Sequence, residues 1–278
     1  MTDARLLDPP LLPLWRAPGV LQLGVDGRVV LDQVPTGLAH AITLLHHPQT
    51  RKSLGHLLPS LDSAWIDWLW AELTRHGALR PASHVRSEVA VVGSGELASQ
   101  LAAALTEADR GNVVHLTRGT EGALVPGHAL RRTWTTQPTL AILATQTAEP
   151  DRTLTDELVR ATIPHLVVRM EPNRAVVGPF VIPGTTGCVR CFDLSRSQYD
   201  TVWPRLLAQL CRATPRAPAA LQGWAVATAI VQVRAHLTGN EPDALGRILE
   251  VRSDDPSLHS LDISAHPDCP CQNTLQDD

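Results

Sequence analysis

The sequence predicts two domains of different class: a small α+β domain over residues 1–82 and a larger α/β domain over residues 83–278. Three observations support this prediction. A chain of 278 residues is long enough for two domains of modest size. Near residue 82 the pattern changes from a hairpin and three helices to an alternation of strands and helices. Four of the five cysteines form two tight pairs, which favour a metal site over disulfides.

The composition excludes several classes of protein. Hydrophobic residues make up 44% of the chain, which is enough apolar material for a folded core. The formal net charge of −4 lacks the basic excess typical of nucleic-acid-binding proteins. No apolar run is long enough to span a membrane, and the first ten residues (MTDARLLDPP) do not resemble a signal peptide. We therefore expect a cytoplasmic protein with no nucleic-acid or membrane partner.

The first domain begins with short strands. We expect strands at 14–16, 20–25 and 28–33, with Asp26-Gly27 as a two-residue turn between the last two. Helices are predicted at 36–46, 50–58 and 62–76, where Thr36 and Asp62 are good N-caps and Gly77 ends the last helix. Residues 80–84 are predicted to be the linker. Three strands and three helices in this length indicate a winged-helix arrangement.

The third predicted helix carries an unusual number of tryptophans. Its core stripe is formed by Ile66, Leu69, Trp70 and Leu73. Trp65 and Trp68 flank this stripe and either fill the core or line an apolar groove beside the hairpin edge. An unpaired strand edge next to such a groove can accept an extended peptide. The helix is acidic where a DNA-reading helix would be basic, which argues against DNA binding.

The second domain begins with a strand at 88–92, a glycine turn and a helix. Gly93 and Gly95 permit the turn, and Ala98 allows close packing of the helix on the strand. With further strands at 112–116, 140–144 and 165–168, this pattern predicts a Rossmann-like, mostly parallel sheet. The second strand ends in Thr117-Arg118 instead of the acid that would hold a ribose. The turn is therefore either a structural relic or a working nucleotide site, and the relic is favoured.

The cysteine pairs predict a closed metal site. Cys188 and Cys191 form C-x-x-C, and Cys269 and Cys271 form C-x-C. Four thiolates are the preferred ligands of structural zinc, which leaves no open position for catalysis. His266 is an alternative ligand in place of one cysteine, and Cys211 is left over.

The residues around the first cysteine pair resemble a known family. The run from Gly178 to Cys191 resembles the first zinc knuckle of ThiF/MoeB-like adenylating enzymes, and residues 225–239 and 246–250 resemble elements that follow it. The second knuckle of that family is usually C-x-x-C, so the C-x-C here is a departure. The N-terminal domain adds a resemblance to PqqD and to ThiF-like (Ocin-ThiF type) leader-peptide-binding partners of YcaO cyclodehydratases, in which it is called the RiPP recognition element.

This resemblance implies a non-catalytic protein of ribosomal-peptide (RiPP) biosynthesis. It would bind the leader of a precursor peptide and present it to a YcaO enzyme that makes azolines, as in bacteriocin or thiopeptide biosynthesis. The candidate peptide-binding residues are Arg28, Val29, Val30, Leu31, Asp32, Gln33, Trp65, Trp68 and Glu72. Zinc is expected as a structural cofactor, and a homodimer is a further expectation because ThiF-like folds are often dimers.

ATP is not expected as a cofactor. Active adenylating enzymes of the family use a second-strand acid and a lysine, whereas the acid is missing here and the only lysine, Lys52, lies in the first domain. Two rival functions stay open: an active ThiF/MoeB-like adenylating enzyme acting on a peptide or carrier-protein C-terminus, and a winged-helix regulator with a zinc-stabilised sensor domain.

Overall fold

The chain forms two compact units in a computed structural model, Met1–Val85 and Arg86–Asp278. The structure describes residues 4–7, 11–27, 29–81, 88–109, 112–116 and 138–275. The predicted division after residue 82 lies close to the boundary between the units, and each unit is described separately. None of the helices in the described ranges is both long and apolar enough to cross a membrane.

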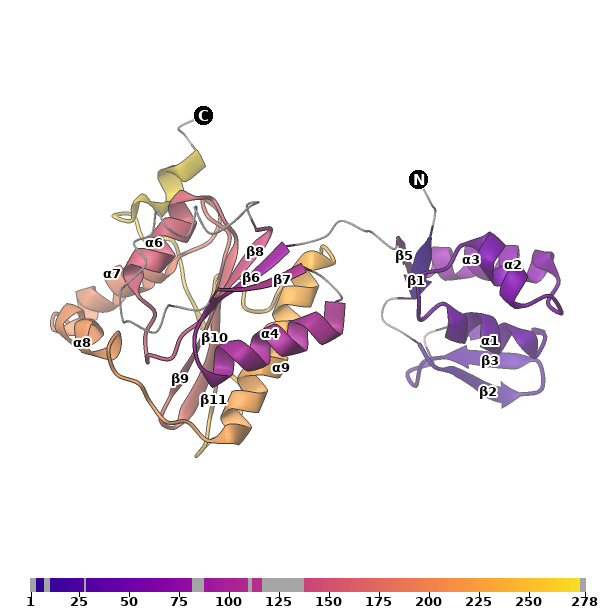
Figure 1. Ribbon diagram of the computed structural model, residues 1–278, viewed down its shortest axis with the longest axis horizontal. Helices are drawn as coiled ribbons and strands as arrows, with labels where there is room; N and C mark the ends of the chain where they lie inside the picture. Colours follow the sequence, from indigo (N-terminus) through magenta and orange to yellow (C-terminus); the bar gives the residue numbers. More distant parts are fainter. Residues whose placement is uncertain are drawn as a thin grey trace. The chain divides into compact units, whose positions relative to one another are not determined.

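A three-stranded antiparallel sheet forms one part of the first unit (Figure 1). Its strands are β2 (Pro13–Ala17), β3 (Val20–Leu23) and β4 (Val29–Leu31). β3 is central, so β2 and β4 are edge strands within the described part of the chain. The register places Leu14, Gln22 and Val30 in one row across the sheet. This row faces away from the core, because the neighbouring row contains the buried Leu21 and Leu31.

Three helices follow the sheet: α1 (Gly37–Leu44), α2 (Arg51–Leu57) and α3 (Ser63–Arg75). Asp62 caps α3 as predicted, since its Oδ1 accepts a hydrogen bond from the Ala64 amide at 2.9 Å. Thr36 occupies the N-cap position of α1 as predicted, but its backbone is already helical and its side chain makes no capping hydrogen bond. Gly77 ends α3 with a φ of 64°.

The connection between β3 and β4 is longer than the predicted two-residue turn. It spans residues 24–28, and Gly24 and Gly27 have positive φ values of 74° and 65° whereas Asp26 does not. The Gln22 side chain donates to the carbonyl oxygens of Gly24 at 2.7 Å and Val25 at 3.1 Å, which stabilises this wider loop. A prediction from local turn propensity takes no account of these contacts of the Gln22 side chain.

The predicted linker is also partly wrong. Residues 79–81 form β5 (Leu79–Pro81), which pairs antiparallel with β1 (Arg5–Leu7) near the N-terminus. Leu7 and Leu79 are both buried, so this pairing closes the core of the first unit. Residues 82–84 of the predicted linker lie outside the described residues.

A seven-stranded sheet forms the centre of the second unit, in the order β12-β11-β10-β9-β8-β6-β7. Its strands are β6 (Glu88–Gly93), β7 (Asn112–Leu116), β8 (Leu140–Ala144), β9 (His165–Glu171), β10 (Arg174–Val181), β11 (Arg247–Arg252) and β12 (His259–Asp262). The strands from β7 to β9 are parallel, but β9 to β12 pair antiparallel. The predicted mostly parallel sheet is therefore corrected to a mixed sheet, because a tight turn after Glu171 reverses the chain.

Helices cover both faces of this sheet (Figure 1). They are α4 (Glu96–Asp109), α6 (Arg152–Arg160), α7 (Val189–Tyr199), α8 (Trp203–Leu210), α9 (Ala219–Leu237) and the 3-10 helix η2 (Pro270–Leu275). α4 and α9 pack on one face through buried residues such as Leu101 and Ala225. α6 and α7 pack on the other face through Leu158 and Val189. The mixed α/β fold therefore has three layers.

Candidate functional site

The four predicted cysteine ligands converge in one buried cluster. Their Sγ atoms all lie within 4.8 Å of one another. Individual Sγ–Sγ distances are 3.8 Å for Cys188–Cys191, 3.7 Å for Cys188–Cys269 and 3.4 Å for Cys191–Cys271. Tetrahedral zinc with Zn–S bonds of about 2.3 Å places its sulfur ligands about 3.8 Å apart. The cluster can therefore hold a metal such as zinc.

Three segments bring these thiols together. Cys188 is the residue before α7 and Cys191 lies in its first turn, so the helix places both thiols on one side. The Cys269 amide donates to the His266 carbonyl at 2.9 Å, and Cys271 lies in η2. Gly187 contacts the backbone just after β12, where an added Cβ would lie 2.3 Å from the Ile263 oxygen. The second knuckle is thereby held against the first.

The thiols affect one another's ionisation. A hydrogen bond from Cys188 raises its own pKa and lowers the pKa of Cys191 to about 4, while burial raises the pKa of Cys269 to about 12. Burying four thiols close together therefore opposes the ionisation of most of them to thiolates, unless a bound cation compensates the negative charge. This is the electrostatic environment expected of a metal-binding site.

The alternative ligand His266 has other contacts. It is 6% exposed, and its Nε2 lies 2.9 Å from the Gln198 Nε2. Its Nδ1 accepts a hydrogen bond from the Asp268 amide at 3.1 Å. Both ring nitrogens are therefore engaged outside the cysteine cluster, which favours the four-cysteine ligand set.

The glycine turn follows β6 at the carboxyl edge of the parallel strands, where open α/β sheets bind ligands. An added Cβ at Gly93 would lie 2.0 Å from the Ala144 carbonyl oxygen, and one at Gly95 would lie 1.9 Å from the Gln146 Nε2. The Gln146 side chain, from the connection after β8, therefore occupies the space directly in front of Gly95. Ala98 lies in the first turn of α4 and is fully buried. The close approach of the Ala144 carbonyl therefore accounts for Gly93, and a side chain at Gly95 would displace the flexible end of Gln146.

The same edge is also covered by the segment around the end of α8. The Ala148 amide donates to the Ala213 carbonyl at 2.9 Å, and the Glu149 amide to the Leu210 carbonyl at 3.4 Å. These backbone bonds hold the end of α8 against the residues that follow β8. This contact joins segments far apart in the chain, so the local sequence pattern does not predict it.

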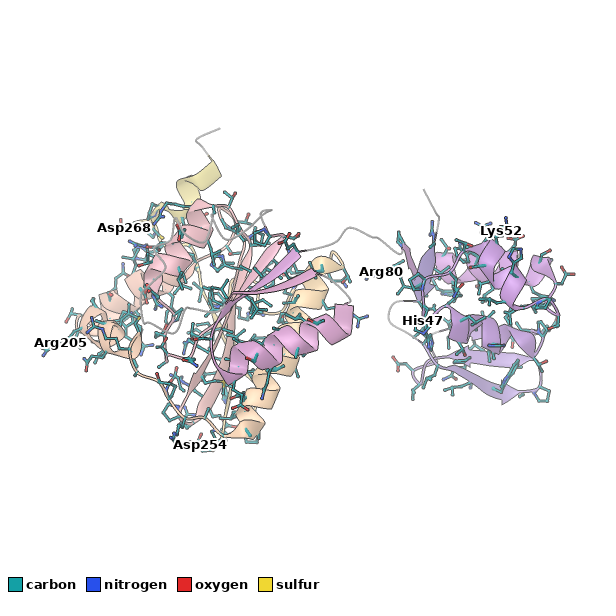
Figure 2. All side chains as sticks on the ribbon, in the orientation of Figure 1. His47, Lys52, Arg80, Arg205, Asp254 and Asp268 are labelled. Carbon is teal, nitrogen blue, oxygen red and sulfur yellow. The ribbon has the colours of Figure 1, made fainter. Side chains whose placement is uncertain are left out.

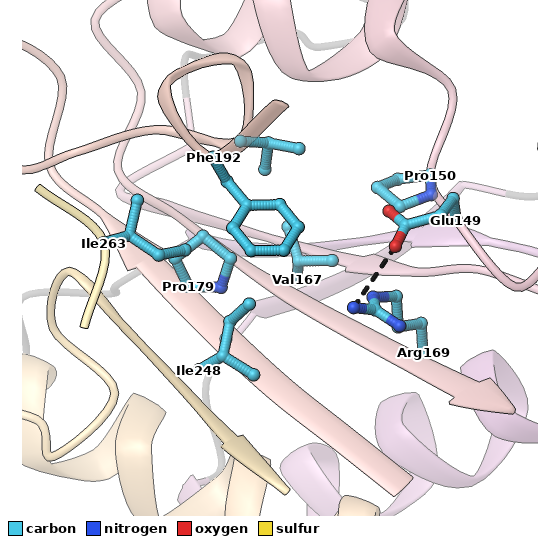
Figure 3. Close-up of a pocket in the computed structure, with 10 residues that line it drawn as sticks. Glu149, Pro150, Val167, Arg169, Pro179, Phe192, Ile248 and Ile263 are labelled. Carbon is cyan, nitrogen blue, oxygen red and sulfur yellow. Dashed lines mark ion pairs between the residues drawn. The ribbon is translucent and has the colours of Figure 1, made fainter. Parts of the chain in front are cut away.

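A buried network of charges lies beside this contact. The Arg152 guanidinium binds Asp193 through two bonds of 2.6 and 2.9 Å and also binds Glu149 at 3.0 Å. Glu149 pairs in turn with Arg169 at 3.2 Å, next to a small pocket that Phe192 and other apolar side chains line (Figure 3). Burial alone would lower the pKa of Arg152, but Asp193 and Glu149 raise it above its usual value. The network fixes α6 and α7 on the sheet.

The candidate peptide-binding strand lies at a sheet edge. Val29 and Leu31 of β4 are buried, whereas Val30 is 38% exposed on the outer face. Asp32 and Gln33 follow the strand, and Gln33 has a φ of 56°. The remaining candidate, Arg28, lies outside the described residues.

The aromatic candidates lie on α3. Trp65 and Trp68 are partly buried and form an edge-to-face pair with ring centroids 5.4 Å apart. Glu72 pairs with Arg75 at 2.7 Å and with His76 at 3.1 Å. α3 contacts α1, α2 and β5, and it shares one hydrophobic core with β4. The expected groove between Trp65 or Trp68 and the β4 edge stays a prediction.

The single lysine lies in the first unit. Lys52 is on α2 (Figure 2), not in the unit that carries the glycine turn. Gln146 and Glu149, which occupy the edge of the sheet, were not predicted as site residues. A polar run after the buried strand 140–144 was the only signal in the sequence for them.

The fold is similar to that of several solved proteins. No protein-family model matches the chain, and no curated protein matches it. A heterocyclase in complex with substrate and cofactor matches with a TM-score of 0.63 and 18% identity, over 97% of this chain and 39% of that chain. The heterocyclase TruD matches with a TM-score of 0.60 and 20% identity, over 96% of this chain and 42% of its own. E. coli MccB, solved with AMPCPP and MccA, matches with a TM-score of 0.54 and 14% identity, over 97% and 99% of the two chains.

The chain therefore shares the fold of these proteins. It spans about two fifths of the length of the two heterocyclase chains and nearly all of MccB. At these sequence identities the similarity establishes the fold alone. The functions of the matched proteins are not transferred to this chain.

Proposed function

We propose that the chain is a non-catalytic leader-peptide-binding protein of RiPP maturation. It recruits a precursor peptide and presents it to a YcaO-type, ATP-dependent cyclodehydratase that makes thiazolines or oxazolines. The observation that carries the proposal is the match over 97% of this chain to only 39% of a heterocyclase solved with substrate and cofactor. We propose that the cyclodehydratase is the partner to which the bound peptide is presented.

The leader binds at the β4 edge as an added strand. The opposite edge strand, β2, is less suitable because it begins with Pro13, is followed by Pro18 and has an irregular register between Trp15 and Ala17. β4 is the other edge strand of the described sheet and contains no proline, which is compatible with pairing to an extended peptide. Trp65, Trp68 and Glu72 are the proposed contacts for leader side chains.

Two contacts support the absence of adenylation. Gln146 fills the space in front of Gly95, and the end of α8 is bonded to the residues after β8. Both contacts lie at the edge at which an α/β sheet would bind a nucleotide. The proposed zinc, held by Cys188, Cys191, Cys269 and Cys271, is structural and joins η2 to α7.

One observation favours a rival function. MccB, which matches over its full length, was solved with AMPCPP, so an adenylating enzyme acting on a peptide or carrier-protein C-terminus is the second candidate. ATP–pyrophosphate exchange by the purified chain would support that candidate. A chain that shows no exchange and binds its leader without ATP would match the recruitment role.

The proposal is tested by fluorescence anisotropy with the leader peptide encoded beside the gene. Val30→Asp places a charge next to the proposed added strand, and we expect it to weaken leader binding about tenfold, which is about 1.4 kcal/mol. Leu57→Asp is the matched control, because Leu57 is an exposed apolar residue on α2 of the same unit. Equal affinities of the Val30→Asp variant and the wild type would exclude the β4 edge, and a wild type that binds no leader would refute the proposed function.

A further inference from the structure

The side chain of Gln272 links the two halves of the cysteine cluster. Its Nε2 donates to the Thr186 carbonyl oxygen at 3.3 Å and to the Cys271 Sγ at 3.4 Å. Thr186 comes shortly before Cys188, so one amide group connects the second knuckle to the segment that leads into the first. Because the Thr186 carbonyl can only accept, the amide must present its nitrogen to this side. A hydrogen bond donated to sulfur favours the thiolate that a metal requires.

Arg190 lies between the two cysteines of the first knuckle. Its Nε donates to the Asp156 Oδ1 at 3.2 Å, and its Nη2 pairs with the other carboxylate oxygen, which fixes the plane of the guanidinium. Asp156 is on α6, which also contacts η2, the helix that carries Cys271. The Arg190 side chain is 49% exposed, and an ion pair of this kind contributes little to the stability of a fold. Its effect is therefore expected at the cluster.

The charge of the cluster explains what these two side chains can do. A divalent zinc with four thiolates is negatively charged as a whole, because the thiolates outnumber the charges of the cation. The four cysteines are at most 4% exposed, so water solvates this charge poorly. The pKa of Arg190 is raised chiefly by Asp156 and in addition by the negative charge of Cys269 and Cys188. The guanidinium is thus within electrostatic reach of one thiol from each knuckle.

We propose that Gln272 and Arg190 are positioning residues of the metal centre, which compensate the negative charge of the thiolates and slow the loss of zinc. Gln272 acts through a hydrogen bond to one ligand, and Arg190 through a fixed positive charge beside the cluster. Groups that surround a metal site in this way typically change metal affinity by about 10- to 100-fold. The inference rests on the four-cysteine zinc site of the proposed function, but not on leader recruitment.

Zinc release from the purified full-length chain to a chromogenic chelator tests the role of Gln272. Gln272→Leu removes the donor and keeps a side chain of similar size, and we expect zinc to leave about tenfold faster. Gln209→Leu is the matched control, because the Gln209 Nε2 also donates to a backbone carbonyl, that of Arg205 at 3.1 Å, but outside the cluster. This control should release zinc at the wild-type rate.

The same measurement tests the charge of Arg190. Arg190→Gln should release zinc about tenfold faster than wild type does. Arg190→Lys keeps the positive charge and should release zinc more slowly than Arg190→Gln. Arg205→Gln is the control, because it removes an exposed arginine on α8 of the same unit.

A second measurement separates this role from a purely structural one. With Co²⁺ in place of zinc, the thiolate-to-metal charge-transfer band should move to longer wavelength in Gln272→Leu, because a thiolate without its hydrogen bond gives up charge more easily. Zinc release at the wild-type rate from Gln272→Leu and Arg190→Gln overturns the inference. Faster release with an unshifted band, and with no difference between Arg190→Gln and Arg190→Lys, also overturns it, since this result would indicate only a looser fold.

The outcomes also distinguish this inference from the proposed function. A wild type that binds no zinc refutes the four-cysteine site and this inference with it, whereas leader binding is measured independently by anisotropy. Zinc release that follows the expected pattern, in a chain that binds no leader, would refute the recruitment role and leave the inference supported.

Discussion

The environment of a single residue in the second unit depends on tertiary contacts that its neighbours in the sequence do not reveal. His165 begins β9 and is completely buried. Its Nδ1 lies 2.9 Å from the Ile163 carbonyl oxygen, while its Nε2 has no hydrogen-bond partner among the described residues. Burial lowers the pKa of His165 to about 4, because the charged imidazolium would lose its hydration. The folded protein therefore holds this histidine neutral.

This burial predicts a pH dependence of stability. His165 ionises near pH 6.5 when unfolded and near 4 when folded, so between these values the unfolded chain binds more protons. Its contribution is fully present above about pH 6.5 and is lost as the pH falls toward 4, by about 3 kcal/mol in total. Urea denaturation at several pH values measures the slope for wild type and His165→Leu. The variant should have a flatter profile over this range, and identical slopes would contradict the prediction.

At the scale of elements, several predictions agree with the structure because they depend on short-range pattern. The strand at 140–144, the Asp62 cap and the helix before Gly77 follow from periodicity and capping residues. The predicted two-residue hairpin turn was wrong because the wider loop depends on contacts of the Gln22 side chain. The predicted linker was partly wrong because β5 forms by pairing with the strand that contains Leu7. The local sequence pattern contains neither contact. The antiparallel half of the large sheet was missed because the parallel pattern was extended past Glu171.

The metal centre gives a prediction at this scale. Cys188→Ser removes one ligand and should abolish the bound zinc measured by elemental analysis of the purified protein. We expect the melting temperature of the second unit to fall by about 10 °C, since loss of a structural metal costs several kcal/mol. Cys211→Ser is the matched control, because Cys211 is half-buried at the end of α8 and outside the cluster. Zinc retained in full by the Cys188→Ser variant would refute the four-cysteine site.

The whole molecule consists of two units with separate cores. One hydrophobic cluster, which contains Leu38 and Trp70, belongs entirely to the first unit. The other clusters, including the one around the four cysteines, belong to the second unit. This division suits a protein in which peptide binding and a metal-stabilised scaffold are carried by different parts of one chain.

Separate cores predict separate unfolding. Differential scanning calorimetry should show two transitions, because no described hydrophobic cluster is shared between the units. A strong zinc chelator should lower the temperature of one transition and leave the other unchanged. A single transition that shifts as a whole with chelator would mean that the two units unfold cooperatively.

Residue types and their spacing along the chain were enough to predict the two-part organisation, the cysteine pairs and most strands and helices of the Rossmann-like part. These features depend on residue type and on spacing along the chain, which are visible without coordinates. Tertiary packing is needed to place the four thiols within 4.8 Å of one another, to bring Gln146 against Gly95 and to bond the end of α8 to the residues after β8. Each of these joins segments between about 50 and 80 residues apart, and such contacts depend on how the layers pack rather than on local propensity.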